Sequence, residues 1–187
     1  MPDIDLDFYD RDKVLENFKH HIAHLGDGKK HNTGVYFHSV PTNPFTNISN
    51  IDYKEADERG YFKIDMLNVH IYKDVLSEEH LNMLLEKEPL WELLTHKEFS
   101  DNLFHVAGHS TILQQMKPQS IEQLAAVLAI IRPAKRNLVG QPWDTVMKNV
   151  WTKPTNDEYY FKKAHAVAYA HAIVVHMNLI CEKISEI

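Results

Sequence analysis

The chain of 187 residues is long enough for one domain with a small second lobe. Because 44% of its residues are hydrophobic and 25% charged, we expect an ordinary soluble core rather than global disorder. The net charge of −6 argues against a general nucleic-acid coat protein, and the single cysteine, Cys181, excludes an internal disulfide and fits a reducing cytoplasm. We expect no membrane span and no signal peptide, because no apolar run approaches about 18 residues and the first residues are acidic.

The first predicted element is a strand over residues 3–8, in which three aspartates alternate with three apolar residues (Asp3, Asp5 and Asp7 with Ile4, Leu6 and Phe8). Side chains of a strand point alternately to its two faces, so the apolar set is expected to be buried and the carboxylates to form a row. Such a row suits Mg²⁺ and predicts metal-dependent phosphoryl or nucleotidyl transfer. The alternative is an amphipathic edge strand whose acidic face is simply hydrated.

A helix is predicted next over about residues 11–25, because apolar residues recur at helical spacing up to the turn at 26–28. A short strand follows around residues 34–37, and the polar segment 41–50 is expected to be a loop. A second acidic strand is predicted over 61–67. Its alternation places Tyr61, Lys63 and Asp65 on one face, so that a cation and a carboxylate point into the same space.

Helical patterns dominate the rest of the chain. Residues 77–94 form a helical pattern broken at Pro89, and a clearer helix begins at Ser120 and stops before Pro133. A long final helix is predicted over about 157–184. Because the strands precede the helices, the sequence predicts an α+β fold.

Charged residues and histidines leave several interpretations open. Residues 74–101 are mainly acidic, whereas residues 132–163 carry seven bases that could follow a phosphate backbone or simply form a solvated surface. Two histidine pairs have the spacing of a helical metal site, but neither has the acidic or cysteine neighbours of a zinc site, so we expect ordinary histidines (His20 and His24, His105 and His109).

Five segments, in order, resemble the palm and fingers of the bacterial DNA polymerase III alpha subunit, the C-family replicative polymerase. PDIDLDF at 2–8 resembles the family's PDxDxDF strand, and KHNTGV at 30–35 resembles its KHAGGV turn. GYFKIDML at 60–67 resembles the KFDFLGL strand, and 117–133, ending in IRP, resembles the segment ending in ALxRPGP. FKKAHAVAYA at 161–170 resembles FNKSHSxAYA.

The resemblance implies a small palm-like mixed sheet of nucleotidyltransferase type in residues 1–75 and a helical fingers-like region in 76–187. It implies that Asp5, Asp7 and Asp65 are the catalytic, metal-binding residues, with Mg²⁺ or Mn²⁺ as cofactor. It also implies nucleotide or phosphate contacts by Lys63, Lys30, His31, Arg132, Lys162, Lys163 and His165. The expected partners are a DNA primer-template, dNTP and other replication proteins, and the expected location is the cytoplasm of a bacterial or phage-infected cell.

The sequence departs from the family at several positions. RPGP is replaced by Arg132-Pro133-Ala134-Lys135, the asparagine and serine of FNKSH are Lys162 and Ala164, and the upstream Gly-Ser phosphate-binding turn has no counterpart. Two hypotheses follow from the resemblance: a minimal polymerase-like nucleotidyltransferase, or a degenerate module that binds DNA, nucleotide or a replication protein. A third hypothesis is a structural or metal-binding protein unrelated to nucleic acid. Arg132 could equally serve the end of its helix, and His165 and Tyr169 could simply pack on one helix face.

Overall fold

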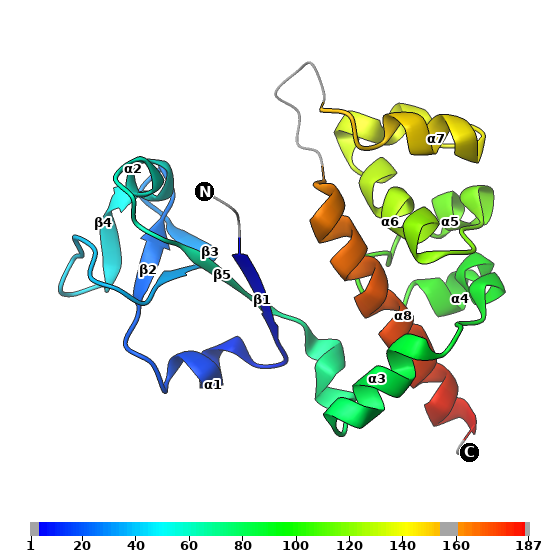
Figure 1. Cartoon of the computed structure of the whole chain (residues 1–187), viewed down its shortest axis with the longest axis horizontal. Coiled ribbons are helices and arrows are strands. Elements are labelled where there is room, and N and C mark those ends of the chain that lie inside the picture. Colours follow the sequence, from blue (N-terminus) through cyan, green and yellow to red (C-terminus); the bar gives the residue numbers. More distant parts are fainter. Residues whose placement is uncertain (1–3, 154–160, 186–187) are drawn as a thin grey trace. The chain divides into compact units, whose positions relative to one another are not determined.

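The computed structural model describes residues 4–153 and 161–185, and the chain divides into two compact units, Met1–Lys73 and Asp74–Ile187. The first unit holds a five-stranded sheet and the second is helical, so the predicted α+β fold is confirmed (Figure 1). Asp3 and the predicted start of the last helix at 157–160 lie outside the described residues.

The sheet of the first unit is mixed, with the strand order β1-β5-β3-β2-β4. Strand β3 runs antiparallel to both of its neighbours, whereas β1 pairs parallel with β5 and β2 pairs parallel with β4. The order along the chain is β1 (Ile4–Phe8), α1 (Arg11–Leu15), β2 (His21–His24), β3 (Lys30–Tyr36), β4 (Ile48–Asp52), α2 (Tyr53–Glu58) and β5 (Ile64–Asn68).

Each face of the sheet carries one short helix. Leu15 of α1 packs with Val35 and Met66 on one face. Ala56 of α2 packs with Tyr36 and with Ala23, Val40, Ile51 and Tyr61 on the other. Since Val35 and Tyr36 are adjacent on β3, strand alternation sends them to opposite faces, which is why the unit has two small cores.

The predicted helix over 11–25 is wrong beyond Leu15. Residues 21–24 form β2, which pairs with β3 on one side and β4 on the other. Ala23 is fully buried in the sheet, whereas Phe18, which the helical pattern would bury, is 57% exposed. Pairing with two neighbouring strands therefore outweighs the local helical spacing.

Three further details of the first unit differ from the predictions. The segment 41–50 is not all loop, because β4 begins at Ile48, and the second acidic strand begins at Ile64 rather than at residue 61. The apolar side chains of β1 are not buried as expected: Ile4 is 37% and Leu6 41% exposed. β1 lies at the edge of the sheet and pairs only with β5, so it has one neighbour to cover it.

The second unit is built around one long helix, α8 (Lys163–Ser185), coloured orange to red in Figure 1. Helix α6 (Ile121–Ile130) is buried at every position from Leu124 to Ile130, as expected for a helix that is apolar all round. The other elements, some of them short 3-10 helices labelled η, are η1 (His70–Asp74, which crosses the unit boundary), α3 (Glu78–Glu86), η2 (Trp91–Thr95), α4 (Lys97–Ser100), α5 (Ser110–Met116), η3 (Pro133–Leu138) and α7 (Trp143–Asn149).

Polar side chains in this unit satisfy helix ends. The predicted helix start at Ser120 is confirmed, because the Ser120 hydroxyl accepts from the Gln123 amide at 3.2 Å. Asn178 of α8 is 2% exposed, and its amide donates to the carbonyls of Leu84 and Lys87 at the end of α3. The buried Lys135 ammonium donates to the Asn149 carbonyl, and burial lowers the pKa of this lysine.

The sequence had predicted no membrane span. Helix α8 is long and apolar enough, by length and composition, to cross a membrane. Yet 56% of its most apolar window is buried within the structure, and Leu84 of α3 packs directly against Val175 and Leu179 of α8. A mostly buried core helix of a soluble protein meets the same criterion, so this feature alone is weak evidence for a membrane span.

Candidate functional site

The two acidic strands lie next to each other in the sheet. β1 and β5 pair in parallel, with Asp5 opposite Asp65 and Asp7 opposite Leu67. Opposed residues of a parallel pair share a face, as do residues two apart on one strand, so all three aspartates project from the same face. Neighbouring strands lie about 4.8 Å apart and alternate residues about 6 to 7 Å apart, so the three backbone positions form a small triangle.

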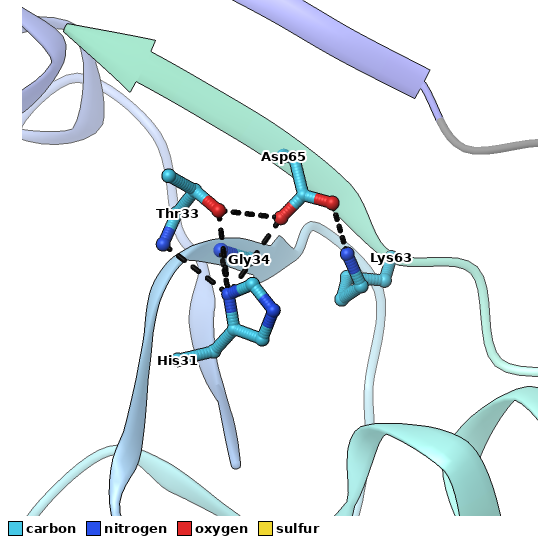
Figure 2. A network of polar contacts seen from close by, with 5 residues as sticks. All are labelled: His31, Thr33, Gly34, Lys63 and Asp65. Carbon is cyan, nitrogen blue, oxygen red and sulfur yellow. Dashed lines mark hydrogen bonds and ion pairs between the residues drawn. The ribbon is translucent and has the colours of Figure 1, made fainter. Parts of the chain in front are cut away.

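Asp65 is the centre of a polar network, drawn in Figure 2. The Lys63 ammonium contacts its Oδ2 atom, and the Thr33 hydroxyl donates to its Oδ1 atom at 2.7 Å. Only 15% of the Asp65 side chain and 17% of the Lys63 side chain are exposed, so the ion pair is largely removed from water. Lys63 lies immediately before β5, and its ion pair with Asp65 confirms the prediction that these two side chains point into the same space.

His31 borders this network and is held by the backbone. Its Nδ1 atom accepts hydrogen bonds from the amide of Gly34 at 2.9 Å and from that of Thr33 at 3.3 Å. An atom that accepts from two amides carries no proton, so His31 is neutral, with its proton on Nε2. Burial lowers its pKa, the charges of Lys63 and Arg11 lower it further, and the Asp65 carboxylate, 3.7 Å from Nδ1, acts in the opposite direction.

This arrangement predicts that acid weakens the first unit locally. The folded state holds His31 with a pKa below 6.5, so the unfolded chain takes up the proton first as the pH falls. The stability contributed by neutral His31 is therefore complete above about pH 6.5 and decreases below it. We expect unfolding curves in urea, followed through the NMR signal of the Gly34 amide, to shift to lower urea between pH 7.5 and pH 5.

The control for this prediction is His31→Gln, because a glutamine oxygen can accept from the same amides without titrating. The variant should lose most of the pH dependence of unfolding that is followed at the Gly34 amide. An equal pH dependence at Gly34 in the variant and the original chain would contradict the assignment.

The aspartates on this face are partly suited to a metal ion. Within residues 4–153 and 161–185, no group of three or more His, Cys, Asp or Glu side chains is arranged to hold one. At Asp65, Lys63 contacts one carboxylate oxygen and the Thr33 hydroxyl donates to the other. Carboxylates of Asp5 and Asp7 on the same face provide the hard oxygen donors that Mg²⁺ prefers, so the donor chemistry fits, provided that Lys63 moves away from Asp65.

The remaining predicted contact residues fall into separate places. Lys30 is exposed at the start of β3, next to His31. The second unit contains Arg132, Lys162, Lys163 and His165, whereas the acidic face belongs to the first. Lys162 and Lys163 are exposed at the start of α8.

Arg132 and His165 meet in an aromatic cluster at the start of α8. The Arg132 guanidinium lies 5.1 Å from the centroid of the Phe161 ring, and the rings of His165 and His105 each lie 4.3 Å from that of Tyr169. His105 has a left-handed backbone, with φ of 59°. Burial among the rings and the charges of Arg132 and His165 lower the pKa of His105. Phe161 and Tyr169 are each only 4% exposed, so Arg132 and His105 are the more accessible groups of the cluster.

Sequence reasoning missed several residues of these sites. Thr33, which bonds Asp65, and Tyr53, whose ring lies 5.5 Å from that of His31, carried no motif signal. The sequence places Arg11 at the start of a predicted helix and gives His105 only the spacing of a histidine pair. Thr33 could have been found from its place beside the glycine of the KHNTGV turn.

Comparison of the chain with protein-family models, curated proteins and solved structures gave no match.

Proposed function

We propose that the protein is a minimal nucleotidyltransferase, similar to the DNA polymerase III alpha subunit, that transfers nucleotides to a DNA 3′ end. The observation that carries the proposal is the register of β1 and β5, which sets Asp5 beside Asp65 with Asp7 on the same face. Two acidic segments that are far apart in the sequence thus lie on neighbouring strands, which supports the proposal of a carboxylate-based site. We further propose a cytoplasmic location in a bacterial or phage-infected cell.

In this proposal Asp5, Asp7 and Asp65 hold Mg²⁺ or Mn²⁺, which would neutralise charge on the attacking and leaving oxygens of the transfer. Lys63 is paired with Asp65 in the structure, and it would turn toward the triphosphate if a metal ion were held by the aspartates. Thr33 and the Gly34–His31 turn keep the Asp65 carboxylate in orientation throughout. Phosphoryl transfer depends mainly on such positioning and charge neutralisation.

A second candidate function is a module that binds DNA, nucleotide or a replication protein without turnover. One observation favours it: both oxygens of Asp65 are engaged by protein groups, which suits a carboxylate that has become structural. Arg132 and the exposed ring of His105, at the aromatic cluster, would then be the main contacts, because cations bind phosphates and bases stack on exposed rings.

One experiment separates the two functions. The full chain is incubated with a labelled primer-template and the four dNTPs, with Mg²⁺, with Mn²⁺ or with EDTA. The transferase predicts primer extension that requires the metal. DNA binding that weakens with salt, without extension under any of the conditions, would support the binding module and reject the transferase.

A further inference from the structure

The first unit contains a cavity of about 370 Å³, within the size range of small-ligand sites. It lies between α1, β2 and the start of β3, on residues of a single unit. Its lining is mainly polar: Arg11, Asp12, Leu15, Glu16, His20, Ile22, Lys30, His31 and Asn32.

Arg11 is the unusual member of this lining. Its side chain is only 16% exposed, and its Nε atom is buried without a hydrogen-bond partner among the described residues. The Asp12 carboxylate oxygen is 3.9 Å from Nη1, beyond hydrogen-bond distance, and that side chain is 79% exposed. A buried guanidinium nitrogen without a hydrogen-bond partner costs stability unless an acceptor, such as the oxygen of an anion, completes it.

The positive and negative groups of the cavity differ in their exposure to solvent. The half-buried Arg11 supplies the positive charge of the lining and the half-buried, neutral His31 supplies an Nε2–H donor, whereas Asp12 and Glu16 are exposed. Lys30 is exposed as well and long enough to reach inward. A ligand with an anionic group at one end would bind Arg11 with that group, and its polar remainder would lie near Asp12 and Glu16.

We propose that this cavity binds the phosphate group of a small molecule, with the Arg11 guanidinium as the central donor and Lys30 and His31 beside it. The planar fork of arginine matches phosphate oxygens, which accept two parallel hydrogen bonds. The source is free phosphate or the phosphate tail of a nucleotide, which share this chemistry. The resemblance assigned no role to Arg11.

His31 belongs to both the cavity and the Asp65 network. A phosphate beside the His31 imidazole would therefore also affect Asp65, because the same ring lies next to both. This deepens the proposed function by giving Lys30 and His31 a defined ligand. The binding itself does not need transfer to occur, since none of Asp5, Asp7 and Asp65 lines the cavity.

The test is calorimetric titration of the full chain with inorganic phosphate, with dATP and with deoxyadenosine, at constant ionic strength and without metal. Phosphate or dATP should bind, and deoxyadenosine should not. Arg11→Met should weaken binding at least tenfold, and Arg11→Lys should weaken it less, because the charge is kept while the fork is lost.

The matched control is Lys13→Met, on the same helix, because Lys13 is 68% exposed and pairs with Asp10 outside the cavity. It should bind like the original chain. Arg11→Met is expected to fold, since it removes a buried nitrogen that lacks a hydrogen-bond partner and keeps an apolar stem. Its melting temperature should thus be unchanged or higher, and phosphate should no longer raise it.

Three outcomes would overturn the inference: no binding of phosphate or dATP at millimolar concentration, equal binding by Arg11→Met, or equal binding of deoxyadenosine. Asp5→Asn separates this inference from the proposed function. If that variant and the original chain both bind phosphate but neither extends a primer, the cavity stands and the transferase fails.

Discussion

Replacing Asp5 by asparagine is expected to reduce metal-dependent primer extension more than about a hundredfold, the scale seen when a central charge-stabilising group is removed from an active site. Asparagine keeps the shape of the side chain but removes the negative charge that a divalent ion needs. Asp5 is exposed on the edge strand β1, so the change should leave the fold intact. Extension is measured as labelled product per unit time with excess primer-template.

The control is Asp27→Asn, which removes a carboxylate from the same unit. Asp27 lies in the turn after β2, where it pairs with Lys29 at 2.9 Å, and its side chain is half exposed. Extension should be unchanged in this variant. If Asp5→Asn extends primers as fast as Asp27→Asn does, the acidic face is not the site of transfer.

Gly34→Ala should have the largest effect on stability, a loss of about 1 to 3 kcal/mol in the free energy of unfolding of the first unit. A Cβ atom at this position would meet Lys63 Cδ at 2.8 Å, and Ala23 Cβ and His31 Nδ1 at 3.1 Å each. Gly34 lies opposite Asp65 in the sheet, so the clash falls on the network itself. Urea unfolding followed by NMR signals of the first unit measures the loss.

Gly26→Ala is the matched substitution, because a Cβ atom there would meet nothing within 4 Å. It should change stability by only a few tenths of a kcal/mol, through the reduced freedom of the unfolded chain. Equal stability of the two variants would mean that Lys63 simply turns aside from Gly34, and that the Lys63–Asp65 pair does not constrain the sheet.

The acidic face could be foreseen from the sequence because its signal is local. Alternation in residues 3–8 and 61–67 places the aspartates of each strand on one face, and Lys63 two residues before Asp65 foretells their contact. That the two strands are neighbours followed only from the resemblance. Nothing in either segment specifies its partner, since pairing in a sheet depends on the whole topology.

The errors arose where tertiary pairing overrides local pattern. Apolar residues from 14 to 25 have helical spacing, yet Ile22 and Ala23 are used by a strand with neighbours on both edges. The acceptor role of His31 could not be predicted either, because it depends on backbone amides aimed at one ring atom. Nor could the burial of the Arg11 side chain be predicted, because it depends on tertiary packing and not on a local sequence pattern.

The position of β1 at the end of the sheet has a consequence for self-association. Its outer edge has no strand partner among the described residues, and Ile4 and Leu6 are partly exposed on one of its faces. Open strand edges recruit strands from other molecules unless charge keeps them apart. The charges of Asp5 and Asp7 are therefore expected to oppose aggregation at this edge. Variants that remove these charges should be studied in dilute solution.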